Sequence, residues 1–200
     1  QREGDTATPT KPGRYAHFGG ANGSIYWSPS TGAQSIQGLI KDKWAALGWE
    51  NSFLGFPTTD ELPGANGGRY NDFGVNGSIY WSAATGAHSV QGSIKDKWVS
   101  LNKEAGPLGY PTTDELPATG GRFNHFAGDN GSIYWSPSSG THVVQGPIKQ
   151  RWGAIGWENS YLGFPTSDQY PATGGLRSDF QGGYIFYDSA TGQATDHRYP

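Results

Sequence analysis

The tetrapeptide Ile25-Tyr26-Trp27-Ser28 recurs as Ile79-Tyr80-Trp81-Ser82 and as Ile133-Tyr134-Trp135-Ser136, with each copy 54 residues after the last. An Asn-Gly pair stands one residue before each copy, and this pair favours the positive φ that a tight hairpin turn needs. In the first copy, residues 14–18 are expected to form the strand that enters the turn, and residues 24–28 the strand that leaves it. The sequence therefore predicts the same β-hairpin three times.

A helical pattern follows each hairpin at the same spacing. In the first repeat, Ile40, Trp44 and Leu47 fall at positions i, i+4 and i+7, whereas the lysines and the aspartate between them face the other way. Gly48 follows directly and can end the helix in a left-handed conformation. The apolar stripe recurs as Ile94, Trp98 and Leu101 and as Ile148, Trp152 and Ile155.

A shortened fourth copy, Ile185-Phe186-Tyr187-Asp188, ends the series without a helix. One hairpin and one short helix are too small to close a core, so neighbouring repeats must share theirs. We therefore expect an α+β fold, a pseudo-symmetric repeat domain of four β-hairpins that alternate with three short helices. A compact, ring-like arrangement is favoured over an open solenoid because the chain begins and ends with hairpin material. A solenoid with a degraded last cap stays open as an alternative.

The repeats also set the expected domain boundaries. Residues 1–12 are polar and contain prolines, which is typical of a tail or linker. Residues 13–200 are expected to form a single repeat domain, with units at approximately 13–67, 68–120 and 121–174 and a partial unit at 175–200.

Composition narrows the classes of function. The formal net charge is -3, which does not favour nucleic acid as a partner. Cys is absent, so disulfides, thiolate metal sites and a Cys nucleophile are excluded. There is no run of about 18 apolar residues, which predicts no membrane insertion. The 32 Gly and 13 Pro indicate many turns, while 8 Trp, 11 Tyr and 9 Phe indicate a folded core.

A Leu-Gly-aromatic-Pro motif follows each helix, at Leu54-Gly55-Phe56-Pro57, Leu108-Gly109-Tyr110-Pro111 and Leu162-Gly163-Phe164-Pro165. Three such motifs in register with three helices and four strand motifs make the chain resemble the LGFP repeat family from residue 13 to about residue 192. Members of that family are mostly secreted or cell-surface proteins of actinobacteria. The resemblance implies an extracellular location and a cell-wall glycan, such as arabinogalactan or peptidoglycan, as the partner.

Several polar residues recur at fixed positions of the repeat. We expect them to serve the architecture as ion pairs or turn-stabilising hydrogen bonds, because three equal environments do not supply the two unequal carboxylates of acid–base catalysis. These residues are Asp60, Asp114 and Asp168 at one position and Arg14, Arg69 and Arg122 at another. No histidine spacing is typical of zinc, and no glycine-rich turn has the context of a phosphate-binding loop. We therefore expect no metal and no cofactor.

Aromatic residues outside the helix stripe are the first candidates for ligand contact. Trp49 and Trp157 follow their helices, and Lys103 replaces them in the second repeat, which indicates a surface position. Three strand tyrosines point to the opposite face from the flanking Ile and Trp, and they offer a stacking platform for a sugar ring if that face is open. These are Tyr26, Tyr80 and Tyr134.

Two histidines complete the candidates. His88 and His142 stand at the position of Gln34, and this exchange suits a hydrogen bond either to a neighbouring repeat or to a sugar hydroxyl. Together these features predict a non-catalytic, monomeric module that binds a cell-wall or other polysaccharide through shallow, repeated sites, whose avidity rises by about 10²–10⁴ through repetition. Two alternatives stay open: a hydrolase of peptidoglycan or polysaccharide that uses Asp or Glu residues, and a scaffold that binds a protein.

Overall fold

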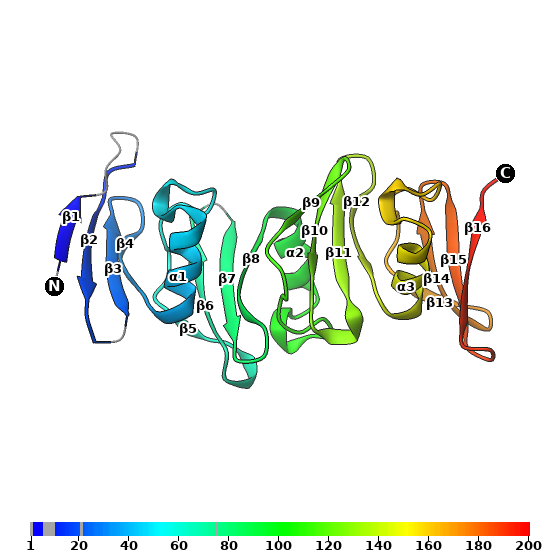
Figure 1. Ribbon diagram of the computed structural model, residues 1–200, viewed down its shortest axis with the longest axis horizontal. Coiled ribbons are helices and arrows are strands. Elements are labelled where there is room, and N and C mark those ends of the chain that lie inside the picture. The colour runs from blue at the N-terminus through cyan, green and yellow to red at the C-terminus, as the bar shows by residue number, and fades with distance from the viewer. Residues whose placement is uncertain (1, 6–10, 21, 75) are drawn as a thin grey trace. The chain divides into compact units, whose positions relative to one another are not determined.

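The computed structural model describes residues 2–5, 11–20, 22–74 and 76–200. The chain divides into two compact units, Gln1–Lys95 and Asp96–Pro200, and each unit is described by itself. Both units contain two antiparallel four-stranded sheets, which confirms an α+β fold built from repeats (Figure 1).

In the first unit the strands of the two sheets follow chain order, as β1-β2-β3-β4 and β5-β6-β7-β8. Helix α1 (Gly38–Leu47) lies between these sheets and contacts β3, β7 and β8 (Figure 1). The strands are β1 (Arg2–Asp5), β2 (Arg14–Phe18), β3 (Gly23–Ser28), β4 (Gly32–Ile36), β5 (Leu62–Pro63), β6 (Arg69–Phe73), β7 (Gly77–Ser82) and β8 (Gly86–Gln91).

The second unit repeats this plan, with sheets β9 to β12 and β13 to β16. Helix α3 (Gly146–Ala154) contacts β15 and β16, and helix α2 (Gly92–Ser100) begins in the first unit and ends in the second. The strands are β9 (Leu116–Ala118), β10 (Gly121–His125), β11 (Ser132–Ser136), β12 (Gly140–Val144), β13 (Tyr170–Ala172), β14 (Gly175–Phe180), β15 (Gly183–Asp188) and β16 (Gln193–Arg198). Single turns of 3-10 helix lie at Trp49–Asn51, Ala65–Gly67, Lys103–Ala105, Gly128–Asn130 and Trp157–Asn159.

The predicted hairpins and helices are confirmed. Asn22, Asn76 and Asn130 have φ values of 48°, 45° and 49°, as the hairpin turns require. Helix α1 ends at Gly48, which adopts the left-handed conformation with a φ of 105°.

Additional strands widen each hairpin into a four-stranded sheet. The short strands β5, β9 and β13 follow the Leu-Gly-aromatic-Pro motifs along the chain. Each is an outer strand of its sheet, where a proline without an N–H is tolerated. The stretch expected to be a polar tail also contains a strand, β1. Arg2–Asp5 can form it because the pairing with β2 uses backbone hydrogen bonds, which need no apolar side chain.

The core of each unit forms around the tryptophan of its helix. Trp44 is fully buried and its ring lies 4.6 Å from Tyr26 of the first sheet and 5.6 Å from Phe73 of the second. Ile79 of the second sheet joins the same cluster. In the second unit, the equivalent cluster surrounds Trp152. Adjacent repeats therefore share one core within each unit, as the sequence predicts.

The ring-like arrangement and the single domain over residues 13–200 stay predictions. None of the helices among the described residues is long and apolar enough to cross a membrane.

Candidate functional site

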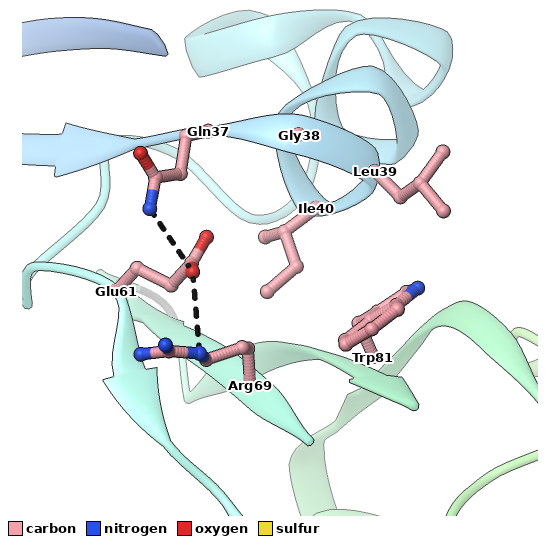
Figure 2. Close-up of a pocket in the computed structure, with 7 residues that line it drawn as sticks. All are labelled: Gln37, Gly38, Leu39, Ile40, Glu61, Arg69 and Trp81. Carbon is pink, nitrogen blue, oxygen red and sulfur yellow. Dashed lines mark hydrogen bonds and ion pairs between the residues drawn. The ribbon is translucent and has the colours of Figure 1, made fainter. Parts of the chain in front are cut away.

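A groove of about 440 Å³ opens in the first unit where the start of α1 meets the second sheet (Figure 2). Four of its residues surround the helix start, one lies directly before β5, and one each comes from β6 and β7. The volume lies within the range of small-molecule sites. The lining residues are Gln37, Gly38, Leu39, Ile40, Glu61, Arg69 and Trp81.

One side of the groove is a polar network centred on Glu61. Gln37 donates from Nε2 to Glu61 Oε1 at 3.3 Å, and Arg69 Nε lies 3.9 Å from the same oxygen (Figure 2). The Glu61 side chain is only 10% exposed, whereas the Arg69 side chain is 51% exposed. The guanidinium therefore remains available to a ligand while the carboxylate is held in place.

The other side of the groove is apolar. Leu39 and Ile40 leave the first turn of α1, and Figure 2 shows the Trp81 indole beside them. Ile40 belongs to the buried core, which anchors this wall, while Trp81 is partly buried against the same cluster. A flat ring beside an amide, a carboxylate and a guanidinium offers both a stacking surface and fixed hydrogen-bonding groups.

The lining supplies little for bond breaking. Hydrolysis of a glycosidic bond ordinarily needs two carboxyl groups, one as acid and one as base or nucleophile. Among the described residues that line the groove, Glu61 is the one carboxylate, and it is engaged with Arg69 and Gln37. Among those parts of the chain that the structure describes, no group of three or more His, Asp and Glu residues could hold a metal ion.

The polar pair of the groove is not kept in every repeat. In the second unit, Arg122 Nε lies 3.4 Å from Glu115 Oε1, which repeats the Arg69–Glu61 pair. In the last repeat, the sequence places Gln169 and Leu176 at these positions. Leu176 packs against the core there, so this repeat lacks the charged pair.

The three tyrosines proposed as a sugar platform are buried. Tyr26, Tyr80 and Tyr134 are 4%, 1% and 3% exposed. The face that carries Tyr26 and Tyr134 is covered by helices, because their rings lie 4.6 Å from Trp44 and Trp152. This corrects the expectation of an open platform.

Trp49 and Trp157 lie outside the groove of Figure 2. Both are half-buried, and their rings contact the helix tryptophans edge-to-face at 5.3 and 5.4 Å. Gly153 lets Trp157 approach α3, because a Cβ at Gly153 would lie 2.5 Å from the indole. Both indoles thus support the core edge, and their contact with a ligand stays a prediction.

The histidine candidates bind their own turns. His88 Nε2 lies 2.8 Å from the Thr85 carbonyl oxygen and His142 Nε2 lies 2.7 Å from the Ser139 carbonyl oxygen. Gln34 donates to the carbonyl three residues earlier in the same way, at 2.9 Å. The His/Gln exchange therefore keeps one N–H donor for the turn, and neither histidine lines the groove.

The repeated aspartates accept hydrogen bonds from the backbone of nearby strands. Asp60 Oδ1 accepts from the Ser35 N–H at 2.7 Å, and Asp168 Oδ1 accepts from the Val143 N–H at 2.9 Å. Burial raises the pKa of Asp168, but bonds from His142, Lys97 and the Val143 N–H outweigh it and hold the pKa well below its usual value. Asp114 and Arg14 occupy the matching positions of other repeats.

His125 gives the second unit a pH-dependent stability. Burial and the Lys149 ammonium, 3.4 Å from Nδ1, lower the pKa of His125 to about 4, against an ordinary value near 6.5. The neutral imidazole is favoured in the fold, so its contribution is complete above pH 6.5 and is lost as the pH falls towards 4. Urea unfolding should show that the loss of this contribution lowers the free energy of unfolding by about 1–2 kcal/mol at pH 4 relative to pH 7. This range already includes the reduction by solvent screening.

Two variants isolate this contribution from that of the carboxylates. His125→Gln should remove the part of the pH dependence between 6.5 and 4 that belongs to the imidazole. His125→Asp should stabilise the fold at pH 7, because Lys149 would gain the type of partner that Lys95 has in Asp72 at 3.2 Å. A wild-type profile parallel to that of His125→Gln would contradict the assignment.

Gln37, Glu61 and Trp81 are not among the site residues predicted from the sequence. Trp81 could have been found, because it points to the opposite strand face from the buried tyrosine. The Glu61–Arg69 pair was harder to predict, since Asp60 stands beside Glu61 in the sequence and is an equally reasonable partner for an arginine.

No curated protein sequence matches the chain. A streptogramin B lyase structure is 12% identical, with 98% of this chain and 54% of the lyase chain covered and a TM-score of 0.20. The extracellular domain of a one-component system from B. thetaiotaomicron is 14% identical, with 88% and 21% covered and a TM-score of 0.20. The chain spans about half the length of the lyase, and TM-scores this low do not indicate a shared fold.

The model of the LGFP repeat matches four consecutive segments, residues 2–52, 54–106, 108–160 and 162–197. These segments follow the periodicity of the hairpins and helices and together span nearly the whole sequence. The chain therefore belongs to the LGFP repeat family.

Proposed function

We propose that this repeat module is non-catalytic and binds a polysaccharide of the cell wall, such as arabinogalactan or peptidoglycan, in the groove lined by Trp81. One observation carries the proposal: an indole faces a groove whose opposite side holds the amide of Gln37, the carboxylate of Glu61 and the exposed guanidinium of Arg69. Planar polar groups can pair with neighbouring hydroxyls, while the indole packs against the C–H face of a sugar ring.

The proposal includes an extracellular location and a monomer. A near-neutral chain with a small net charge of -3 suits an uncharged glycan better than a polyanion. A polymer that presents the same sugar many times can also contact several repeats at once, so weak individual contacts suffice.

Trp81→Ala is expected to weaken sedimentation with insoluble cell walls by about tenfold or more, the usual effect of removing an aromatic anchor. The matched control is Trp27→Ala, because β3 and β7 have the same sequence and Trp27 lies outside the groove. Purified arabinogalactan and peptidoglycan then distinguish the two glycans. Circular dichroism should show that both variants stay folded.

Three outcomes would count against the proposal. Equal losses of cell-wall binding in both variants would show that the groove is not the binding site. Full binding by Trp81→Ala would show the same. Release of reducing ends from the walls by wild type would show a hydrolase instead. The double variant Trp49→Ala plus Trp157→Ala tests separately whether those two indoles contact the glycan.

A further inference from the structure

A second groove in the first unit, of about 400 Å³, lies beside the Leu54-Gly55-Phe56-Pro57 motif. Its lining includes Ser30 in the turn between β3 and β4 and Gly74 directly after β6. It shares no lining residue with the groove of Figure 2. In the second unit, a side chain of the protein itself fills the equivalent place.

That side chain is Gln181, which directly follows β14 as Gly74 follows β6. Its Oε1 accepts a hydrogen bond from the Phe164 N–H at 3.0 Å, and its Nε2 donates to the Ser138 hydroxyl at 2.9 Å. We call this place, formed by the Phe164 N–H and the Ser138 hydroxyl, the amide seat. Its packing is tight, because a Cβ on Gly163 would lie 2.4 Å from Gln181 Oε1. The second unit thus shows how this place holds a carboxamide through one backbone donor and one hydroxyl.

The first unit keeps the backbone of this seat without the carboxamide. The Gly74 N–H donates to the Phe56 carbonyl at 3.0 Å, as the Gln181 N–H donates to the Phe164 carbonyl at 3.0 Å. In the part of the chain that the structure describes, no protein group accepts a hydrogen bond from the Phe56 N–H. Among the described residues, this donor of the seat is therefore open to a ligand.

The hydroxyl of the seat is kept as well. Ser30 Oγ lies 3.1 Å from Ser28 Oγ, and the equivalent distance at Ser138 is 3.2 Å. Pro12 and Pro29 add apolar surface next to these hydroxyls. The groove therefore combines an amide-binding seat with the mixture of apolar and hydroxyl groups that a sugar ring can contact.

We propose that this second groove binds the acetamido group of an N-acetylated sugar, with its amide in the place that Gln181 fills in the second unit. The acetamido carbonyl accepts from the Phe56 N–H, and the acetamido N–H donates to the Ser30 hydroxyl. The choice of a sugar among amide-bearing ligands rests on the proposed polysaccharide function; the amide seat itself does not.

The test is a titration of the ¹⁵N-labelled full chain with N-acetylglucosamine, followed through the amide resonances. The Phe56 amide should shift with N-acetylglucosamine and should not shift with glucose. Gly74→Gln should place a carboxamide in the seat and weaken binding by about tenfold, as expected when a hydrogen-bonded position is occupied. Gly74→Ala is the matched control and should bind like wild type, because a Cβ there meets only the Phe56 carbonyl at an ordinary 3.7 Å.

The reverse change should create a site. Gln181→Gly opens the equivalent place in the second unit, and the Phe164 amide should then respond to N-acetylglucosamine. An unmoved Phe56 amide, equal shifts with glucose, or undiminished binding by Gly74→Gln would each overturn the proposal. Stronger binding of a glutamine-containing peptide than of the sugar would overturn the assignment to a sugar.

Failure of this inference differs from failure of the proposed function. If Phe56 does not respond but wild type still sediments with cell walls and Trp81→Ala does not, the acetamido seat is wrong and polysaccharide binding stands. If Phe56 responds while neither protein sediments, the seat stands and the cell-wall function is wrong.

Discussion

Trp44→Ala is expected to lower the free energy of unfolding by about 3–5 kcal/mol, the range for removing a large aromatic side chain from a core. Trp44 is fully buried between two sheets, and Tyr26, Trp49 and Phe73 all lie against its ring. Its Nε1 also donates to the Gly55 carbonyl at 3.2 Å. The substitution therefore leaves a cavity and an unpaired buried carbonyl, in a fold whose total stability is typically about 5–15 kcal/mol.

Urea unfolding followed by far-ultraviolet circular dichroism measures this loss without depending on tryptophan fluorescence. Trp27→Ala is the matched control, because Trp27 is 41% exposed in the first sheet, and it should cost less than about 1 kcal/mol. Similar losses in the two variants would show that the helix tryptophan does not hold the shared core.

Asn71→Ala should destabilise the first unit by about 2–4 kcal/mol, since two part-buried carbonyls lose their donor. Asn71 is fully buried in β6, and its Nδ2 donates to the Ser35 carbonyl at 3.0 Å and to the Thr59 carbonyl at 2.9 Å. The bond to Ser35 connects the second sheet to β4 of the first, and the bond to Thr59 reaches the loop before β5. In β2 the equivalent residue is Ala16.

Asn71→Asp separates the hydrogen bonds from the shape of the side chain. The carboxylate keeps the size of the amide but turns its donor into an acceptor that faces two carbonyls. The same urea experiment at pH 7 should therefore show a loss at least as large as that of the alanine variant. An aspartate variant as stable as wild type would mean that the amide does not join the sheets.

The local elements could be predicted because each depends on a short pattern. Asn-Gly pairs specify the hairpin turns, and the spacing of Ile40 and Trp44 specifies the apolar face of α1. Burial depends on what covers a strand. Strands β3 and β7 have the same sequence, yet Ile25 is 41% exposed and Ile79 is fully buried, because α1 covers the second sheet from the side of Ile79.

The site was harder to predict for the same reason. Gln37 and Trp81 are 44 positions apart in the sequence and meet only because α1 packs on the next sheet. The strand tyrosines were candidates only if their face was open, and the structure buries them. Periodicity shows that two faces differ and does not show which one is covered. The histidines illustrate a further limit: a hydrogen-bonding role was foreseeable, but its partners were not. Both histidines contact a carbonyl of their own turn, and His142 Nδ1 also lies 3.7 Å from Asp168 Oδ1.

The most direct test of polysaccharide binding between repeats is an amide and indole NMR titration of the full chain with soluble cell-wall oligosaccharides. The largest shifts should fall on the Trp81 indole N–H and on the backbone amides of Gln37 to Ile40, and Trp81→Ala should abolish those of the helix start. Unchanged resonances at Trp81 and the helix start, with shifts only at Trp49 and Trp157, would contradict it.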